Sequence, residues 1–373
     1  MTIAINAKHL LKSYREGYGN FIYECLIRIT KQFPQHNFIF IFDKPFHSSF
    51  IFSANVIPVV VGPSTKKLFL LKFWYNYKIP VVLKKYRADL FITPEACSLR
   101  TKVPQVLIIH DLTFLNHPAF SKKYYKKYYE KYIVKFLNKA TGVAALSGFC
   151  KDRIIKDYRI DSAKIEIMYN GVDEIFKPVD FDEREKIKEQ HAQGNEYFLF
   201  CTNHNLINIL KAFSVFKKWQ KSSMQLLIAS GSALKPDELQ SLRLFKHRED
   251  VKILESSLPD LPQVIAGAYA MVDLSYFESF GVHSLEAMKC NVPVITVNEI
   301  AMSEICGDAA LLVNYKEHED IAEKMMMVFK DERLRKDLIN KGSEQVKRYT
   351  WHKTAELLWE SILQASHSKF IFE

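Results

Sequence analysis

Short runs of β-branched and aromatic residues alternate with longer amphipathic segments along the whole chain, and this alternation restricts the fold more than any other feature. Apolar runs of this length between helical segments are typical of buried strands in parallel sheets that helices cover on both faces. The expected strands of the first half are TIAIN, NFIFIF, ANVIPVVVG, ADLFIT, VLII, GVAA and KIEI. The pattern restarts at YFLFCT and continues through MQLLIASG, DVKILE, AMVDLSY, VPVIT and ALLVN. The sequence therefore predicts an α/β protein with two doubly wound parallel sheets.

The length of the chain agrees with two domains, because 373 residues are too many for one ordinary core. The charged stretch 181–196, FDEREKIKEQHAQGNE, is expected to connect them. The six cysteines are scattered without metal-ligand or disulfide spacing, which is typical of reduced thiols in the cytoplasm. No apolar run reaches the ~18–20 residues that a membrane span needs, and the N-terminal residues lack the pattern of a signal peptide. We therefore expect a cytoplasmic protein.

The stretch 276–314 carries the clearest candidate site. Two carboxylates, Glu278 and Glu286, stand eight positions apart with Phe280 and Gly281 between them. The first part reads as a loop after a strand, and SLEAM reads as the start of a helix with Ser284 as its cap and Glu286 in its first turn. Free amides at such a helix start attract anions, so the arrangement suits a ligand with an anionic middle and hydroxyls at both ends. The alternative is that both glutamates are solvated and Gly281 only forms a turn.

Other polar residues follow expected strands of the first half. His110 and Asp111 come directly after VLII, at the carboxyl end of a strand where α/β proteins bind ligands. The alternative is a histidine that hydrogen-bonds to nearby backbone. Gly17 and Gly19 form a G-x-G turn between the first strand and the first helix, which is a weak signal without the longer glycine pattern. Asn170 begins a turn after KIEI.

Charge is unevenly placed along the chain. Residues 1–180 carry 28 Lys and Arg against 14 Asp and Glu, whereas residues 181–373 carry 24 against 28. In segments 66–87 and 122–139, lysines alternate with Phe, Trp and Tyr. This composition indicates either ordinary amphipathic helices with solvated lysines, or helices that rest on an anionic membrane surface. Nucleic acid is the weaker partner, because only six arginines occur in the first 180 residues and no stacking motif is present.

Taken in order, these features resemble the retaining glycosyltransferases of the GT-B fold, in the large family 4 that uses nucleotide sugars. The family signature is E-x7-E with F-G inside, followed by E-A-M, P-V-I and G-D-A-A. In this chain it stands as Glu278, Phe280-Gly281, Glu286-Ala287-Met288, Pro293-Val294-Ile295 and Gly307-Asp308-Ala309-Ala310. Further matches are Gly17 and Gly19, His110-Asp111-Leu112, Ser147, Asn170-Gly171-Val172-Asp173 and the segment Trp351 to Ala355. The matches cover nearly the whole chain.

The resemblance implies two Rossmann-like domains facing across a cleft. Residues 1–175 would form the acceptor-side domain, to which the C-terminal helix 351–373 crosses back, and residues 176–350 would bind the nucleotide sugar. Glu278 would contact the hydroxyls of the donor sugar near the reacting carbon, and Glu286 would hold the ribose. We therefore expect Glu278 to be catalytic.

The resemblance assigns the remaining site residues as well. Backbone amides at Phe280, Gly281 and Val282 would face the sugar and the pyrophosphate. His110 would line the donor sugar from the other domain as a second catalytic residue, with Asp111 and Asn170 among the substrate-binding residues. Gly17 and Gly19 would let the first loop approach the diphosphate.

The implied reaction transfers a hexose from a GDP- or UDP-linked sugar to a glycan or lipid-linked acceptor, in cell-surface polysaccharide or lipopolysaccharide synthesis. Transfer would retain the anomeric configuration. No cofactor or metal is expected, because main-chain amides and basic side chains would stabilise the departing diphosphate. The protein would lie at the inner face of the membrane, held peripherally by its basic first domain.

One departure from the family pattern concerns the loop after YFLF. Members of the family usually carry an Arg-Lys pair there, whereas this chain has a shorter loop and no Arg or Lys before Lys211. His204 is a partial substitute at best. The departure leaves open a degenerate member that binds a nucleotide sugar or glycan without transfer. A sugar-nucleotide epimerase is a further alternative, but that group lacks E-x7-E followed by E-A-M.

Overall fold

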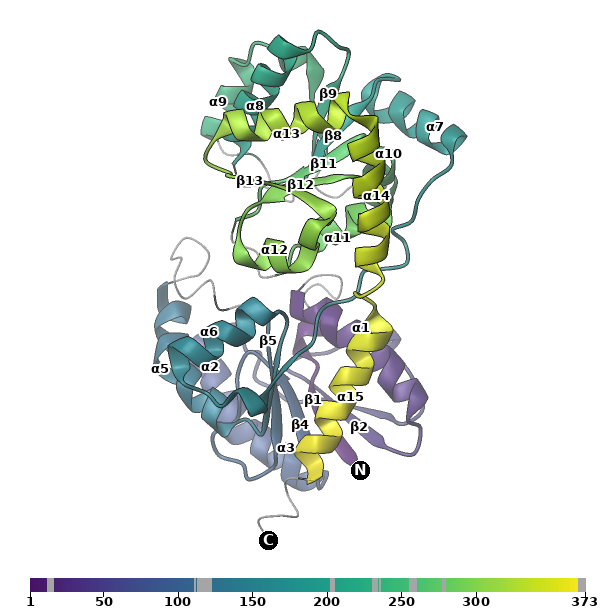
Figure 1. Ribbon diagram of the computed structural model, residues 1–373. Coiled ribbons are helices and arrows are strands. Elements are labelled where there is room, and N and C mark those ends of the chain that lie inside the picture. The colour runs from purple at the N-terminus through teal and green to yellow at the C-terminus, as the bar shows by residue number, and fades with distance from the viewer. Residues whose placement is uncertain are drawn as a thin grey trace. The chain divides into compact units, whose positions relative to one another are not determined.

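The computed structural model describes residues 1–11, 17–110, 112, 123–201, 205–229, 234, 236–254, 260–276 and 280–367. The chain forms two compact units, coloured along the sequence in Figure 1. The first unit comprises Met1–Gly171 together with Trp351–Glu373, and the second comprises Val172–Thr350. The sequence placed this division after residue 175.

The sheet of the first unit is entirely parallel over the described residues, with strand order β3-β2-β1-β4-β5-β6-β7. The order reverses between β1 and β4, and ligands of doubly wound folds bind at the carboxyl ends of strands at such a point. The strands are β1 (Thr2–Asn6), β2 (Asn37–Phe42), β3 (Val56–Val60), β4 (Leu90–Pro94), β5 (Gln105–Ile109), β6 (Gly142–Ala145) and β7 (Ile165–Ile167).

Helices cover both faces of this sheet (Figure 1). Side chains of β1 alternate between the two faces, so that Ala4 packs with one core cluster whereas Ile3 and Ile5 pack with the other. The face with Ala4 is covered by α2 (Leu68–Phe73), η3 (Trp74–Lys78), α3 (Ile79–Lys85), α5 (Lys123–Lys139) and α6 (Gly148–Tyr158). The opposite face is covered by α1 (Gly17–Gln32) and α15 (Trp351–His367). Short 3-10 turns are η1 (Lys8–Leu11), η2 (Ser48–Phe50) and η5 (Ser162–Lys164).

The second unit repeats the same design. Its described strands form a parallel sheet of order β10-β9-β8-β11-β12-β13, which reverses between β8 and β11. The strands are β8 (Tyr197–Phe200), β9 (Gln225–Ala229), β10 (Val251–Leu254), β11 (Ala270–Asp273), β12 (Val294–Val297) and β13 (Ala310–Val313). The helices are α7 (Phe181–Ala192), α8 (Leu206–Trp219), α9 (Pro236–Arg243), α10 (Leu261–Gly267), α11 (Val282–Lys289), α12 (Ile300–Cys306), α13 (His318–Lys330) and α14 (Glu332–Val346), with short turns η6 (Arg248–Asp250) and η7 (Gly307–Ala309).

The predicted fold class is confirmed, since both sheets are parallel, doubly wound and built from the expected runs. The expected connection at residues 181–196 is wrong, because most of it is helix α7 of the second unit. Ile187 and Lys188 of α7 are buried, and both Arg184 and Lys188 pair with Glu196. Its charges therefore belong to a packed helix rather than to a solvated linker.

Candidate functional site

The candidate site of the second unit lies where its strand order reverses, at the carboxyl ends of β8 and β11. The chain leaves β11 at Asp273 and enters α11 at Val282. Residues 277–279, and with them the predicted catalytic Glu278, lie outside the described residues. The described part of the site consists of Asp273 and the start of α11.

Asp273 anchors this region from the end of β11. Its side chain is fully buried, and its carboxylate accepts hydrogen bonds from the backbone N–H of Ser275 (3.1 Å) and the hydroxyl of Ser284 (3.0 Å). Its backbone carbonyl accepts a third bond from the hydroxyl of Thr296 on β12 (3.1 Å). A buried carboxylate is stable only with such partners, so Asp273 ties the following loop and the first turn of α11 to the sheet.

The start of α11 differs from the sequence prediction. Gly281, with φ of +48°, is the N-cap, and Ser284 is the third residue of the helix. The expected Ser284 cap is wrong because this hydroxyl donates to Asp273 instead of accepting from the helix backbone. A Cβ atom on Gly281 would lie 2.7 Å from both Sδ and Cε of Met302, so glycine is favoured by the backbone angle and by space. The first amides of a helix have no acceptor within that helix, and such helix starts are positions at which anions bind.

Glu286 is the fifth residue of α11 and not in its first turn, because the helix begins three residues earlier than predicted, with Gly281 instead of Ser284 as its cap. Its side chain is only 12% exposed, and Oε2 lies 2.8 Å from Nδ1 of His283. His283 was not predicted as a site residue, although its spacing of three positions from Glu286 places both on one helix face. His283 fixes the orientation of this carboxylate next to the helix start.

The loop between β8 and α8 meets the same edge of the sheet. Asn205, with φ of +64°, caps α8 and donates from Nδ2 to the carbonyl of Leu274 (3.0 Å). Burial, with Asp273 and Glu286 nearby, raises the pKa of the Cys201 thiol well above its usual value.

The loop before α8 was expected to lack the usual basic pair. Lys211 is exposed at the sixth position of α8, and His204 lies outside the described residues. Among the described residues of this loop, none is a cation.

In the first unit, His110 follows β5 as predicted, and its ring lies 4.0 Å from that of Tyr18 and 5.5 Å from that of Phe21. Its backbone N–H donates to the hydroxyl of Tyr18 (3.4 Å), while its Nε2 is buried without a partner among the described residues. Burial, with His9 nearby, lowers the pKa of His110 from 6.5 to about 3. The side chain is therefore a neutral imidazole at physiological pH. Asp111 lies outside the described residues.

The remaining predicted residues of the first unit occupy different settings. Gly17, with φ of +50°, is the first residue of α1, and a Cβ there would meet nothing within 4 Å. Gly19 lies buried inside α1, so the expected G-x-G turn is wrong at its second glycine. Asn170 has a buried Oδ1 without a partner in the described part of the chain. Its neighbour Tyr169 accepts from the hydroxyl of Thr354 on α15 (2.6 Å).

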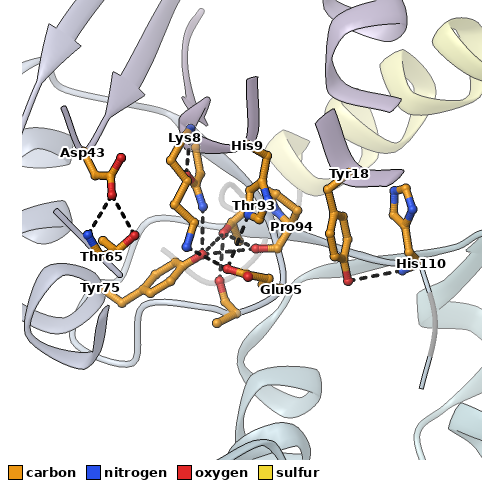
Figure 2. Close-up of polar contacts among 12 residues, drawn as sticks. Lys8, His9, Tyr18, Asp43, Thr65, Tyr75, Thr93, Pro94, Glu95 and His110 are labelled. Atoms are coloured by element: carbon orange, nitrogen blue, oxygen red, sulfur yellow. Dashed lines mark hydrogen bonds and ion pairs between the residues drawn. The ribbon is translucent and has the colours of Figure 1, made fainter. Parts of the chain in front are cut away.

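A charged cluster that the sequence did not predict lies at the point where the order of the first sheet reverses. Lys8 and His9 follow β1, Glu95 follows the adjacent β4, and we refer to the three as the Glu95 cluster. Figure 2 shows both basic side chains meeting the carboxylate, with Nζ of Lys8 at 2.7 Å and Nε2 of His9 at 3.3 Å from Oε2. Only the pairing of β1 with β4 brings these residues together, since Lys8 and Glu95 are 87 positions apart.

Two doubly wound units, each with polar groups where its strand order reverses, define the GT-B class of glycosyltransferases. The family model described as "Glycosyl transferases group 1" matches residues 183–345, and that described as "Glycosyltransferase Family 4" matches residues 33–175. The chain belongs to this family of glycosyltransferases, as the sequence predicted.

Relatives and solved structures agree with this assignment. The chain is 26% identical over 318 residues to the O-antigen chain mannosyltransferase RfbU of Salmonella typhimurium, with 82% of this chain and 84% of the relative covered. It is 24% identical over 253 residues to the O-antigen chain mannosyltransferase B of Escherichia coli, with 66% of each covered. The fold is similar to that of Anabaena Alr3699/HepE in complex with UDP-glucose, with a TM-score of 0.72, 16% identity, and 97% and 99% of the two chains covered.

Proposed function

We propose that this chain transfers a hexose from a nucleoside diphosphate sugar to a glycan or lipid-linked acceptor in O-antigen or related cell-surface polysaccharide synthesis. The start of α11 carries this proposal. Gly281 is the N-cap of this helix, so the first backbone amides follow it, and the side chain of Glu286 in the next turn is 12% exposed. Amides suit a diphosphate, and a carboxylate suits the two hydroxyls of a ribose. The names of the two O-antigen mannosyltransferases support a mannose donor and a polysaccharide product.

In the proposed mechanism the second unit binds the donor and the first unit binds the acceptor, with His110 as a proposed catalytic residue of the first unit. Glu278 contacts the donor sugar, and the amides of Phe280, Gly281 and Val282 stabilise the charge that develops on the departing diphosphate. We propose retention of configuration and independence from metal, as in the family that the motifs resemble. Asn170, Asp111, Gly17 and Gly19 are proposed as further substrate contacts.

The donor is tested first by ligand-dependent stabilisation. A thermal-shift screen against UDP- and GDP-linked hexoses should raise the unfolding midpoint with one nucleotide, because a ligand that binds only the folded state stabilises it. Release of nucleoside diphosphate with a polyprenyl-diphosphate-linked sugar as acceptor then measures transfer. Glu278→Ala and Glu286→Ala should each lower this rate at least tenfold, with Glu332→Gln on α14 as the control. Unchanged rates in both variants would refute the assignment of the site.

An anionic membrane surface is the proposed location of the first unit. Four large apolar side chains follow one another at spacings of four along α2, η3 and α3: Phe69, Phe73, Tyr77 and Val81 are 64%, 40%, 47% and 65% exposed. This segment carries four lysines, and Lys66 and Lys67 directly precede it. An exposed apolar stripe between lysines suits the boundary between lipid headgroups and acyl chains. In the part of the chain that the structure describes, no helix is long and apolar enough to cross a membrane.

Liposome flotation tests this location. The protein should float with vesicles that contain phosphatidylglycerol at low salt, and less so with neutral vesicles, because the lysines supply the attraction. The double variant Phe69→Ser with Tyr77→Ser should lose most of the floated fraction, whereas Leu239→Ser, an exposed apolar residue of the second unit, should not. Failure of the unaltered protein to float at low salt would end the proposal.

The loop after β8 favours a second candidate function, a nucleotide-sugar-binding protein that does not transfer the sugar. The described residues of this loop supply no cation for the diphosphate, and Lys211 is exposed on the helix that follows. Binding of a nucleotide sugar without release of nucleoside diphosphate, with or without acceptor, would select this function over the transferase.

A further inference from the structure

The Glu95 cluster lies at the point of the first sheet where ligands of doubly wound folds bind, at the carboxyl ends of the neighbouring strands β1 and β4. None of its members belongs to the residues that the family motif marks. Lys8 and His9 are buried, while the side chain of Glu95 is 17% exposed. The carboxylate is therefore the most accessible charged group of the three.

Glu95 is held as an anion. Burial by itself would raise its pKa, but the ammonium of Lys8 and the ring of His9 lower that pKa well below the usual range. Nζ of Lys8 also lies 5.3 Å from the ring centre of Tyr75, whose hydroxyl accepts from Nδ2 of Asn6 (2.7 Å). Lys8 is thus enclosed by a fixed set of partners (Figure 2), and Glu95 balances its charge.

The backbone at Glu95 adopts an unfavourable conformation that places the carboxylate in this position. Its φ is +73°, and the N–H of Ala96 donates to the carbonyl of Pro94 (2.9 Å) across it. The hydroxyl of Thr93 donates to the carbonyl of Ala96 (2.7 Å) and holds the turn from the other side. A non-glycine residue at positive φ in such a tight turn is uncommon, and strain of this kind gathers at functional sites.

The two oxygens of the carboxylate differ in their surroundings. The basic side chains of Lys8 and His9 both contact Oε2, and Oε1 has no hydrogen bond or ion pair to a described residue. The ring of His9, which contacts Oε2, is followed by those of Tyr18 and His110, with centroid distances of 5.2 Å from His9 to Tyr18 and 4.0 Å from Tyr18 to His110. Figure 2 shows Tyr18 between the two histidines. An anionic oxygen next to aromatic rings is the usual surrounding of a bound sugar, whose hydroxyls donate and whose C–H face packs on rings.

We propose that Glu95, oriented by Lys8 and His9, accepts hydrogen bonds from hydroxyl groups of the acceptor's terminal sugar, and that the ring of Tyr18 packs against that sugar. The proposal rests on the proposed function and names the part of the acceptor that the first unit recognises. Because Lys8 is already neutralised, the anionic carboxylate of Glu95 repels a phosphate and favours an uncharged hexose. Donor sugar and acceptor sugar share this chemistry, so the test must separate them.

Saturation-transfer NMR with octyl glycosides of mannose, glucose, galactose and N-acetylglucosamine provides the test, because it detects binding without turnover. The unaltered protein should transfer saturation to the ring protons of at least one glycoside. Glu95→Gln, which keeps the shape and removes the charge, should weaken that binding about 10- to 100-fold. Glu24→Gln is the matched control, since Glu24 forms an ion pair on α1 of the same unit and is 14% exposed.

Donor binding is measured on the same variants by the midpoint shift with UDP- and GDP-sugars, and should be unchanged in Glu95→Gln. Equal glycoside binding in Glu95→Gln and the unaltered protein would overturn the proposal, as would the absence of binding to all four glycosides. Loss of donor binding from Glu95→Gln with glycoside binding intact would also overturn it, because Glu95 would then serve the donor. If Glu95→Gln does not fold, Glu95→Asp keeps the charge and should still weaken glycoside binding. Failure of the unaltered protein to bind any nucleotide sugar would refute the proposed function instead.

Discussion

The hydrogen bond from Ser284 to Asp273 gives the most direct prediction about the donor site, because it joins the first turn of α11 to the end of β11. Both side chains are fully buried or nearly so, and the bond is 3.0 Å long. Ser284→Ala removes the donor hydroxyl, so Oδ2 of Asp273 loses this hydrogen bond. The backbone N–H of Ser275 still reaches Oδ1, so the carboxylate keeps one partner.

The size of the effect follows from the charge of the acceptor. A hydrogen bond to a charged group contributes about 1.5–3 kcal/mol, and alanine gains about 0.5 kcal/mol over serine within a helix. The net loss is about 1–2.5 kcal/mol. For a unit of about 180 residues, Val172–Thr350, this lowers the unfolding midpoint of that unit by about 2–10 °C.

The assay combines local stability with nucleotide binding. Hydrogen exchange of peptides from α11 reports the free energy of opening that segment, and calorimetry reports the affinity for UDP or GDP. Ser284→Ala should speed exchange in α11 and weaken nucleotide binding about tenfold, equivalent to about 1.4 kcal/mol. Thr296→Val is the matched control, because Thr296 donates a neutral, equally buried bond to the carbonyl of the same Asp273. It should cost about 0.5–1.5 kcal/mol and leave nucleotide affinity within about twofold.

Two results would refute this reasoning. If Ser284→Ala leaves nucleotide affinity unchanged while α11 opens more easily, the helix start does not contact the nucleotide. If Thr296→Val weakens nucleotide binding as much as Ser284→Ala does, the affinity depends on the general stability of the unit and not on the position of α11.

Three further predictions concern single groups. Gly281→Ala should destabilise the second unit by about 1–2 kcal/mol in urea unfolding, because the backbone angle is unfavourable for alanine and Met302 must move. Gly17→Ala is the control: its φ is +50° and no atom lies within 4 Å of the added Cβ, so it should show only the smaller cost of the backbone angle. The pKa of His110 is lowered from 6.5 to about 3, so between these pH values the unfolded chain binds a proton that the folded chain does not, and the free energy of unfolding should rise with pH. His110→Gln should flatten this rise. An unchanged slope would contradict a buried, neutral His110. His283→Gln should weaken nucleotide binding less than Glu286→Gln in the same titration, because His283 only orients the carboxylate; an equal loss would assign His283 a direct contact.

The fold could be predicted from the sequence because it depends on local patterns. Runs such as NFIFIF and QLLIA are too apolar and too short to be anything but buried strands, and helices between them force parallel pairing. The start of α11 was less accessible to prediction, since serine is a common cap whereas the real cap is a glycine at positive φ. Ser284 instead takes its role from Asp273, eleven positions earlier in the chain.

The Glu95 cluster could not be predicted from sequence patterns. Lys8 and His9 stand in KHLL, where charged residues ordinarily face solvent, and Glu95 stands in a loop. Their proximity depends on the neighbouring position of β1 and β4, which a single sequence does not give. The positive φ of Glu95 was equally hidden, because glutamate carries no preference for that region.

The two units each have a carboxylate where the strand order reverses, but the two carboxylates have different surroundings. In each, the fourth strand pairs with the first, and a carboxylate follows or ends it: Glu95 after β4 and Asp273 on β11. Asp273 is fully buried and bonded to a hydroxyl and an amide, so it is a structural group that holds the start of α11 against the sheet. Glu95 has Lys8 and His9 on one oxygen, and its side chain is 17% exposed, so in our proposal it contacts a ligand itself. A helix start that attracts anions in one unit and a carboxylate that repels them in the other would direct the diphosphate of the donor to the second unit and an uncharged sugar to the first.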